Sequence, residues 1–406
     1  MGLLLDTSTR DALHAGVSQN KPAFEGDAVE LLDQLVRLAV NQRASDIHLE
    51  PKHDRLQVRI RVDGAMLETQ AIAMTTGAQI ISRIKVLGRM DIAERRLPQD
   101  GQLALWIDGE RVHLRASTFP SSQGEKVVLR ILSGGSLLAF NRLGLGVEEQ
   151  ARIREIVSRP QGFVVTSGPT GSGKTSTLYG FLDVIDTTQV NVVTLEDPIE
   201  AELDGITQGQ VNVRSGFTFA SGLRSILRQD PDVILVGEIR DSETAGIAMQ
   251  AALTGHLVMS TLHTSDTVET VVRLVDLGVE SWIVANALSV VLAQRLVRMV
   301  CANCVQMVKL ETELRDGDDL LMAAGTPIAR PVGCPSCMRT GYRGRTGIFE
   351  VLELDDELRE LVKAKAAARA YREIFAKRRI RSLRRAGFEK VAAGITTEAE
   401  VMRVTT

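Results

Sequence analysis

The stretch GPTGSGKT, residues 168–175, has the residue types and spacing that bind nucleotide phosphates. Glycines let successive backbone N–H groups turn towards the α- and β-phosphates, and Lys174 places a positive charge on the β- and γ-phosphates. The Thr175 hydroxyl can bind Mg²⁺. An apolar run at 163–165 precedes the stretch and a helix-forming segment follows, so ATP and Mg²⁺ are expected here, with a ligand-free glycine-rich turn as the alternative. The residues expected to contact the nucleotide are Gly168, Pro169, Thr170, Gly171, Ser172, Gly173, Lys174, Thr175 and Ser176.

An acid that follows a second apolar strand is the first candidate for activating water. Phosphoryl transfer needs a residue that orients water and charge that stabilises the departing phosphate. The stretch DVILVGE, residues 232–238, resembles the second nucleotide-hydrolysis motif of P-loop ATPases, but Gly237 stands where that motif usually has aspartate. We therefore expect Glu238 to polarise water or to help hold the metal through water. A solvated acid at the end of a strand is the alternative.

Two further residues complete the predicted catalytic set. Glu196 is the first of three carboxylates in TLEDPIE, residues 194–200, which ends another predicted strand. One of these acids is expected to orient water, and a turn built around the proline is the alternative. His263 follows a strand and can hydrogen-bond the γ-phosphate, whereas His256, before that strand, fits a structural role about as well. The predicted catalytic residues are Lys174, Glu196, Glu238 and His263.

All four cysteines fall into two C-x-x-C pairs. This spacing is typical of a tetrahedral Zn²⁺ site, and four thiolates leave no ligand position for a substrate. Two structural disulfides would be rare in a cytosolic protein. We predict a structural zinc, with redox chemistry as the alternative. The predicted ligands are Cys301, Cys304, Cys334 and Cys337.

Size and composition are those of an ordinary globular protein. The chain has 406 residues, of which 44% are hydrophobic and 24% charged, enough for two or three domains with cores of their own. No apolar run approaches the roughly 20 residues that span a bilayer, and the opening residues lack a secretory pattern. The sequence therefore predicts a cytoplasmic protein.

Charge argues against nucleic acid as a partner. The formal net charge is -3 and only 4% of residues are aromatic, which leaves little general attraction for polyanions and few stacking platforms. Residues 363–385 are the exception, because ten basic residues there meet a single acid, Glu373. This tract could contact anionic lipid, an acidic subunit or nucleic acid, and a solvated helical face is the alternative.

The first part of the chain predicts a small α+β domain. Residues 1–27 form a polar lead-in, and an amphipathic pattern at 29–39 then predicts a helix. Alternation at 56–62 predicts a half-buried strand that Asp63 and Gly64 turn into a hairpin. The domain should cover 28–137, with a hinge at 134–136. Further strands are expected at 103–107 and 127–132, and a further helix at 80–87.

Residues 138–300 predict a mostly parallel sheet between helices, because short apolar strands alternate there with helical segments. Ligands of such sheets bind at the carboxyl ends of the strands. The predicted strands lie at 163–165, 190–195, 233–236 and 257–260.

These motifs, in this order and spacing, resemble the secretion ATPase superfamily over nearly the whole chain. Further matching motifs are ASDIH at 44–48, RVDG at 61–64, RRLPQDG at 95–101 and GYRGRTG at 341–347. Within the superfamily, QAALTGHLVMSTLH at 250–263 and EVMRVT at 400–405 look most like type II secretion ATPases, and pilus assembly ATPases are close relatives. The family shares the glycine at position 237.

The resemblance implies an α/β fold with several domains. A RecA-like P-loop NTPase domain is expected next to a smaller, PAS-like α+β domain, followed by a zinc-binding and helical C-terminal region. The implied boundaries are 28–137 for the small domain, 138–300 for the ATPase domain, 301–340 for the tetracysteine subdomain and 341–406 for the C-terminal helical region.

The resemblance also implies a hexamer in which arginines of the small domain reach the nucleotide. The function that the resemblance implies for this chain is to hydrolyse ATP and so drive pseudopilus assembly and protein export at the cytoplasmic face of the inner membrane. The implied partners are further copies of the chain and an inner-membrane secretion platform with its cytoplasmic docking protein, and acidic phospholipid is another candidate. The matching arginines are Arg61, Arg83, Arg96 and Arg115.

One departure concerns the start of the chain. Members of the family usually carry a further N-terminal domain that docks on the membrane partner, and only a polar lead-in is expected here, so the chain is either a truncation or a short natural variant. A type IV pilus assembly ATPase, a nucleic-acid translocase and a non-hydrolysing scaffold are the competing functions. Intact Lys174, Thr175 and Glu238 argue against the scaffold.

Overall fold

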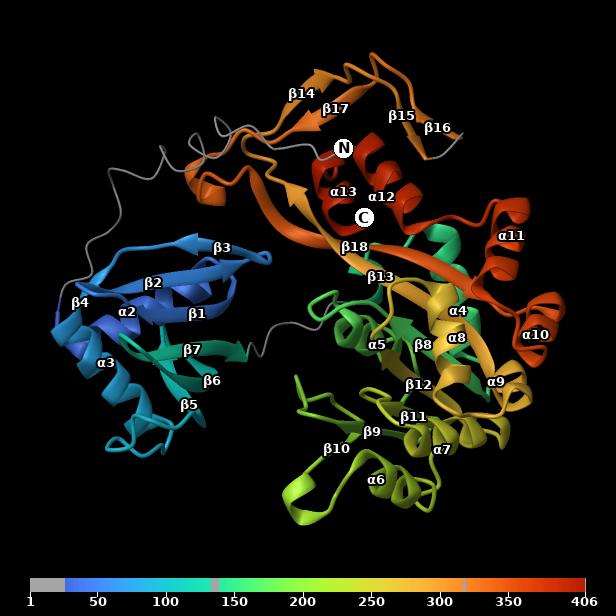
Figure 1. The fold of residues 1–406 in the computed structure, drawn as a ribbon, viewed down its shortest axis with the longest axis horizontal. Helices are drawn as coiled ribbons and strands as arrows, with labels where there is room; N and C mark the ends of the chain where they lie inside the picture. The colour runs from blue at the N-terminus through green and yellow to red at the C-terminus, as the bar shows by residue number, and fades with distance from the viewer. Residues whose placement is uncertain (1–25, 133–138, 317–318, 406) are drawn as a thin grey trace. The chain divides into compact units, whose positions relative to one another are not determined.

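The computed structural model describes residues 26–132, 139–316 and 319–405. These residues fold as two compact units, of which one precedes residues 133–138 in the chain and the other follows them (Figure 1). The polar lead-in predicted for residues 1–27 therefore lies almost wholly outside the described residues, as does the hinge predicted at 134–136. No helix in the described ranges is long and apolar enough to cross a membrane.

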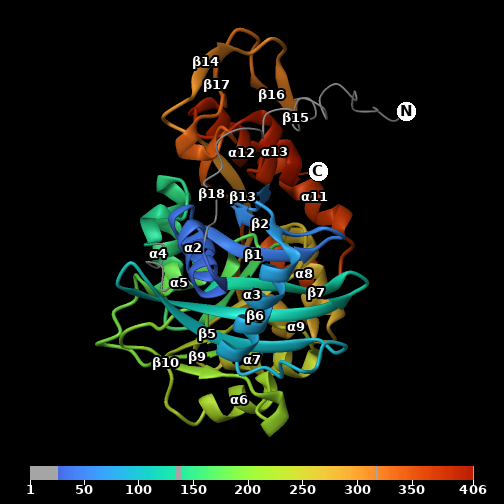
Figure 2. The same cartoon turned by 90° about the vertical axis from the view of Figure 1, so that its left-hand side faces the viewer.

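The N-terminal unit is an antiparallel sheet with two helices on one of its faces (Figures 1 and 2). Its strands run in the order β3-β2-β1-β7-β6-β5, and β4 pairs with β2. Asp63 and Gly64 both have positive φ, 49° and 83°, which suits a tight hairpin and confirms the predicted turn between β2 and β3. The elements are α2 (Ala28–Asn41), β1 (Ala44–Pro51), β2 (Arg55–Val62), β3 (Ala65–Glu68), β4 (Ile72–Ala73), α3 (Met74–Leu87), β5 (Gln99–Ile107), β6 (Glu110–Ser121) and β7 (Gly124–Leu132).

Alternation along these strands separates a covered face of the sheet from an open face. Ile47, Val58, Leu114 and Leu129 are fully buried on the side that packs against α2 and α3. Their neighbours in sequence project to the other side. Polar and charged residues of β1, β2, β6 and β7 therefore share the open face of this unit.

The C-terminal unit is built on a second sheet of seven strands, in the order β10-β9-β11-β12-β8-β13-β18. All its pairs are parallel except β13 with β18. The central strands are buried along their whole length, as expected for a parallel sheet that is covered on both faces. The elements of the sheet and of its helical layers are η1 (Phe140–Arg142), α4 (Val147–Val157), β8 (Gly162–Ser167), α5 (Lys174–Leu182), β9 (Val192–Glu196), β10 (Thr207–Gln210), η2 (Val213–Ser215), α6 (Phe219–Ile226), β11 (Val233–Val236), α7 (Ser242–Leu253), β12 (Leu257–Leu262), α8 (Thr267–Asp276), α9 (Ser281–Ala287) and β13 (Leu288–Val300).

Two hydrophobic cores lie on the two faces of this sheet. Phe163 and Val165 of β8 face a core that α6, α7, α8 and α9 complete. Val164, between them, faces a second core with residues of η1, α4 and α5. The three layers place the start of α5 beside the carboxyl ends of the parallel strands, where α/β proteins bind their ligands.

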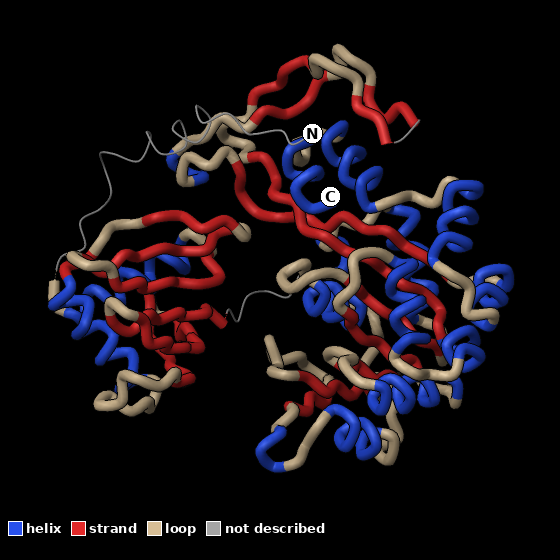
Figure 3. Tube along the Cα trace, viewed as in Figure 1, coloured by secondary structure: helices blue, strands red, loops and turns tan. Residues whose placement is uncertain are grey.

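The end of the chain contains more strand than the sequence predicted. The strands expected in this unit ended at residue 260, and 341–406 was expected to be helical, whereas β13 and β18 are the two longest strands of the sheet (Figure 3). Their pairing joins segments about 50 residues apart in the chain, which local patterns do not reveal. The remaining elements are β14 (Gln306–Lys309), β15 (Leu314–Asp316), β16 (Asp319–Met322), β17 (Pro327–Arg330), η3 (Pro335–Cys337), β18 (Tyr342–Glu353), α10 (Asp356–Lys363), α11 (Ala368–Arg378), α12 (Leu383–Ala392) and α13 (Glu398–Thr405).

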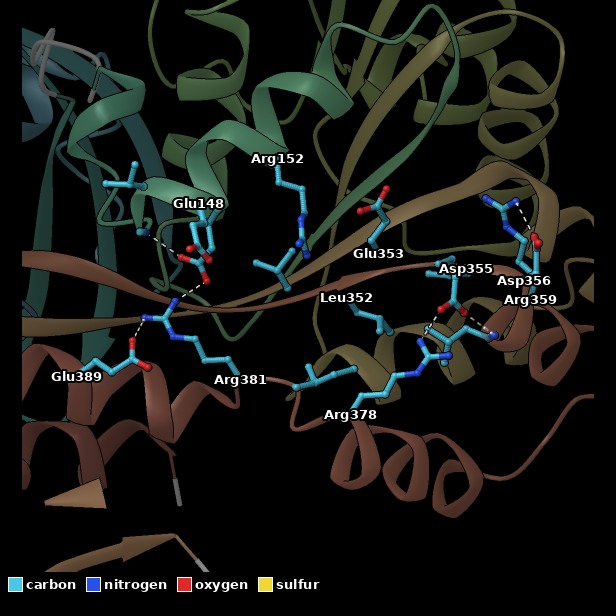
Figure 4. A pocket seen from close by; sticks show the side chains of 17 residues that line it. Glu148, Arg152, Leu352, Glu353, Asp355, Asp356, Arg359, Arg378, Arg381 and Glu389 are labelled. Atoms are coloured by element: carbon cyan, nitrogen blue, oxygen red, sulfur yellow. Dashed lines mark hydrogen bonds and ion pairs between the residues drawn. The ribbon is translucent and has the colours of Figure 1, made fainter. Parts of the chain in front are cut away.

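Acids of the same chain neutralise much of the basic tract at 363–385. Arg378 pairs with Asp355 and Glu357. Arg381 pairs with Glu149 and with Glu389, and both of its pairs measure 2.5 Å. Figure 4 shows several of these pairs along an open pocket between α4, the end of β18 and the start of α10. The pocket shares no residue with the stretch 168–175. The arginines therefore tie α11 and α12 to the rest of the unit.

Candidate functional site

The predicted phosphate loop connects β8 to α5 and packs against β13. Gly168 and Gly173 have φ values of 150° and 88°, which favour glycine. A Cβ atom added at Gly168 would lie 2.6 Å from the backbone carbonyl oxygen of Gln294. A Cβ atom added at Gly173 would lie 2.9 Å from the side-chain amide nitrogen of Gln294. Both glycines are needed because β13 approaches the loop so closely. Ser172 Oγ is buried and has no hydrogen-bond partner among the described residues, so it can donate to a phosphate oxygen.

Lys174 begins α5 and is nearly buried. Its ammonium group donates to the carbonyl oxygens of Gly168, at 2.8 Å, and Pro169, at 3.2 Å. Burial lowers the pKa of Lys174 to about 8; the charge of Glu238 opposes this shift and that of Arg295 adds to it. A phosphate anion would favour the charged form and could replace the two neutral carbonyl partners.

Glu238 and His263 lie together at the carboxyl ends of β11 and β12. Nε2 of His263 lies 3.5 Å from Oε2 of Glu238, and the other oxygen of Glu238 pairs with Arg240. The side chain of Glu238 is 15% exposed and that of His263 is 50% exposed, so water can reach both. Because Glu238 also acts electrostatically on Lys174, three of the four predicted catalytic residues lie in one neighbourhood.

Glu196 is held differently from Glu238. It is 2% exposed at the end of β9, and its oxygens accept hydrogen bonds from the hydroxyls of Tyr179 and Thr194 and from the amide of Gln208. Burial, together with the hydrogen bond to Glu196, raises the pKa of Tyr179 well above its usual value, which keeps the phenol a donor. These contacts tie α5, β9 and β10 together and favour a structural role for Glu196.

The backbone of β9 lies close to Gly237, which stands where the usual motif has aspartate. Its N–H donates to the carbonyl oxygen of Leu195 at 2.8 Å. A Cβ atom at Gly237 would lie 3.3 Å from that oxygen and 3.4 Å from the Cα atom of Glu196. The end of β11 thus packs too tightly on β9 for a longer side chain without a shift. His256 lies at the opposite edge of the sheet, where Nδ1 is 2.9 Å from the carbonyl oxygen of Ala251, a structural contact.

Sequence reasoning missed Gln294 and Arg295, which lie in β13 beside the loop. The Gln294 side chain accepts a hydrogen bond from Thr177 Oγ1 of α5 at 2.8 Å. Arg295 lies near Lys174, since its charge lowers the pKa of that lysine. The only local signal was a polar pair inside a long apolar run, because the contacts depend on the pairing of β13 with β8. Ala293 stands opposite Ser167, the residue before the loop.

The register of the N-terminal sheet separates the four predicted arginines. Arg61 and Arg115 lie in one row of the open face, together with Asp46 and the unpredicted Arg130. Asp46 pairs with Arg130 at 2.9 Å and with Arg61 at 3.7 Å. Arg83 lies instead on α3, which packs on the covered face. Arg96 lies in a loop, where it is 88% exposed and pairs with Glu94.

The four cysteines form one cluster. None is in a disulfide, and their sulfur atoms all lie within 4.8 Å of one another. The Sγ atoms of Cys301 and Cys334 are 3.9 Å apart, and so are the Sγ atoms of Cys304 and Cys337. Four sulfurs bound to one zinc ion at about 2.3 Å and tetrahedral angles are roughly 3.8 Å apart, so the cluster fits zinc.

Backbone N–H groups surround these sulfurs. Gly333 donates to Sγ of Cys304 at 3.3 Å, and Cys334 and Gly341 each donate to Sγ of Cys337 at 3.2 Å. Such bonds stabilise thiolates and orient them as ligands. The cluster follows the end of β13 and precedes β18, so it closes the base of the segment 301–341.

Comparison with known sequences places the chain among secretion proteins. Residues 24–403 match the family described as type II/IV secretion system protein. The chain is 46% identical over 392 residues to the type II secretion system ATPase E of Vibrio cholerae, covering 95% of this chain and 78% of that protein. It is 47% identical over 388 residues to the type II secretion system protein E of Klebsiella pneumoniae, covering 94% of this chain and 77% of the other.

Solved structures share the mixed α/β fold. The ATPase DotB of Legionella pneumophila has a TM-score of 0.69 at 21% identity, covering 95% of this chain and 97% of DotB. The pilus retraction motor PilT, solved with bound ADP, has a TM-score of 0.61 at 23% identity, covering 92% and 96%. At these identities the likeness establishes the fold.

Proposed function

The chain belongs to the type II/IV secretion system protein family, and on this premise we propose that it is the ATP-hydrolysing motor of a type II secretion system. Its task would be to drive pseudopilus assembly and protein export. Relatives named for type II secretion, at 46% and 47% identity over nearly the whole chain, support this choice over a type IV pilus assembly ATPase. The observation that carries the proposal is the convergence of Lys174, Glu238 and His263 beside the phosphate loop.

Each of these residues has a task in hydrolysis. The loop amides and Lys174 bind the phosphates, with Lys174 exchanging its contacts to the loop carbonyls for phosphate oxygens. Glu238 orients and polarises the attacking water, and His263 steadies the γ-phosphate by hydrogen bonding. Mg²⁺ would neutralise charge on the β- and γ-phosphates, and Thr175, half-buried in the first turn of α5, is the hydroxyl placed to hold it.

We also propose roles for domains within the two units. Residues 138–300 act as a RecA-like ATPase domain that β18 extends, and residues 28–137 act as a PAS-like partner domain. The tetracysteine segment, 301–340, binds zinc. Helices α12 and α13 pack next to it, whereas α10 and α11 pack on α8 and α9. The motor works at the cytoplasmic face of the inner membrane with the secretion platform and its docking protein. Because internal ion pairs neutralise much of the tract 363–385, our proposal places no lipid contact there.

Steady-state hydrolysis of MgATP by the full chain tests this function. The phosphate loop alone leaves the γ-phosphate open on one side, so the motor is expected to act as a homo-oligomer, specifically a hexamer, in which arginines close the site. Specific activity should then rise with protein concentration as the chain assembles. A chain that binds ATP at every concentration but releases no phosphate would contradict the proposed function.

The arginines on the open face provide variants for the same assay. We expect Arg115→Ala or Arg130→Ala to lower turnover by roughly 10-fold or more, with a smaller effect on ATP affinity, because an arginine that meets charge in the transition state contributes mainly to kcat. Arg61→Ala tests the third member of the row. Arg83→Ala is the matched control on the covered face. Full activity in all three open-face variants would rule out this closure.

We predict one Zn²⁺ per chain, bound by the four cysteines, because the sulfur spacing fits a closed tetrahedral shell. Elemental analysis of the reduced protein should find it. Replacing Cys334 and Cys337 by serine should remove the metal and loosen the segment 301–341 before ATP affinity falls. Reduced wild-type protein without zinc would overturn the assignment.

A further inference from the structure

Arg295 of β13 joins two parts of the site that are distant in sequence. Its Nη1 donates to the carbonyl oxygen of Gln294 at 2.9 Å, and its Nη2 donates to the carbonyl oxygen of Ser265 at 2.7 Å. Ser265 lies two residues beyond His263. No acid forms an ion pair with Arg295 within residues 139–316 and 319–405, so two backbone carbonyls are its anchors.

The Gln294 end of this bridge is fixed to the phosphate loop. The backbone of Gln294 passes so close to Gly168 that a Cβ atom there would lie 2.6 Å from its carbonyl oxygen. The Gln294 side chain is buried and bonded to Thr177 of α5. One end of the Arg295 guanidinium is therefore held by a part of the protein that cannot move without moving the loop.

The other end of the bridge holds the segment that carries His263. This segment leaves β12 after Leu262 and runs to Asp266, the N-cap of α8. Burial lowers the pKa of Arg295, and the charges of Asp266, Glu350 and Glu269 oppose that shift. None of these acids forms an ion pair with Arg295 in the described residues, and two of them are occupied elsewhere: Asp266 caps α8, and Glu350 accepts from Thr267 at 2.6 Å.

We propose that Arg295 is a positioning residue for ATP hydrolysis, which holds the segment 263–265 against the wall of the phosphate loop and so keeps His263 beside Glu238. The inference rests on the proposed function. Two divergent carbonyls require two N–H directions from one rigid group, and the planar guanidinium provides them. A lysine at this position keeps the charge but not the two fixed donors.

A double-mutant cycle with His263 tests the proposal. We expect Arg295→Ala and Arg295→Lys each to lower kcat by roughly 10- to 100-fold, as loss of a supporting contact does, while ATP affinity changes less than about threefold. Because the effect passes through His263, the double variant Arg295→Ala/His263→Ala should have a kcat less than about twofold below that of His263→Ala alone. Arg152→Ala, an exposed arginine of α4, is the matched control and should keep full activity.

Three outcomes would overturn the proposal. Full activity in Arg295→Lys would mean that charge alone matters. If the fold-losses of kcat in the two single variants multiplied in the double variant, Arg295 would act independently of His263. A loss of ATP affinity at unchanged kcat would make Arg295 a direct phosphate ligand.

Hydrogen exchange gives a readout that does not depend on hydrolysis. Backbone amides between 263 and 266 should exchange faster in Arg295→Lys and Arg295→Ala than in Arg152→Ala, without nucleotide, because the anchor of the segment is lost. Unchanged exchange would also overturn the proposal. Absence of hydrolysis in the unmodified chain would instead contradict the proposed function and leave this exchange test intact.

Discussion

Lys174→Ala is expected to lower ATP hydrolysis by roughly a thousandfold, equivalent to about 4 kcal/mol of transition-state stabilisation. Lys174 is the cation at the start of α5, next to the phosphate loop and within the electrostatic reach of Glu238. Among the described residues its ammonium group donates to the carbonyls of Gly168 and Pro169, which are parts of the loop itself. Phosphate release under saturating MgATP, with ATP binding measured separately, gives the two effects.

A half-buried lysine provides the matched control for this variant. Lys390 of α12 donates to the carbonyl oxygen of Gly144 at 2.9 Å, in the same manner as Lys174, but lies outside the phosphate loop. Lys390→Ala should therefore keep its turnover per folded molecule. Turnover near the wild-type rate in Lys174→Ala would refute the assignment of the site.

Glu238→Gln is expected to keep ATP binding and to lose turnover by roughly 100- to 10,000-fold, the range attributed to general acid–base catalysis. The amide keeps the shape of the side chain but not the charge that polarises water. The carboxylate pairs with Arg240 and lies 3.5 Å from His263, so the substitution also weakens the contact that holds His263. Single-turnover measurements with pre-bound ATP would separate the chemical step from binding.

Glu155→Gln is the matched control for Glu238→Gln. Glu155 is an exposed acid of α4 whose partner is Arg159, and it should be replaceable without effect on turnover. Normal hydrolysis by Glu238→Gln would show that another acid activates water. Glu196→Gln would then be the next variant, although three hydrogen-bond donors already surround that carboxylate.

The parts of the site that depend on local sequence could be predicted. The phosphate loop needs glycines, a lysine and a hydroxyl at fixed spacing, and they lie between β8 and α5 as the pattern requires. Each C-x-x-C pair brings two sulfurs together by itself, and two such pairs are typical of one zinc site, so the four-cysteine cluster could be anticipated. Glu238 and His263 follow buried strands, and parallel strands end at one edge of a sheet, so their proximity could be anticipated.

The parts that depend on long-range pairing could not be predicted. Gln294 and Arg295 reach the loop because β13 pairs with β8, over a hundred residues earlier in the chain. Arg130 was overlooked although its strand was expected, because only the register against β6 and β1 places it beside Arg115 and Asp46. Glu196 was ranked as a catalytic acid on its position, and only its contacts with α5 and β10 favour a structural role.

The decisive experiment is a structure of the assembled chain with Mg²⁺ and a non-hydrolysable ATP analogue. We expect the γ-phosphate within hydrogen-bond distance of Lys174, a water between that phosphate and Glu238, and an arginine from the row of Arg61, Arg115 and Arg130 completing the site. A nucleotide whose phosphates lie away from Lys174, or a γ-phosphate with no water near Glu238, would contradict it.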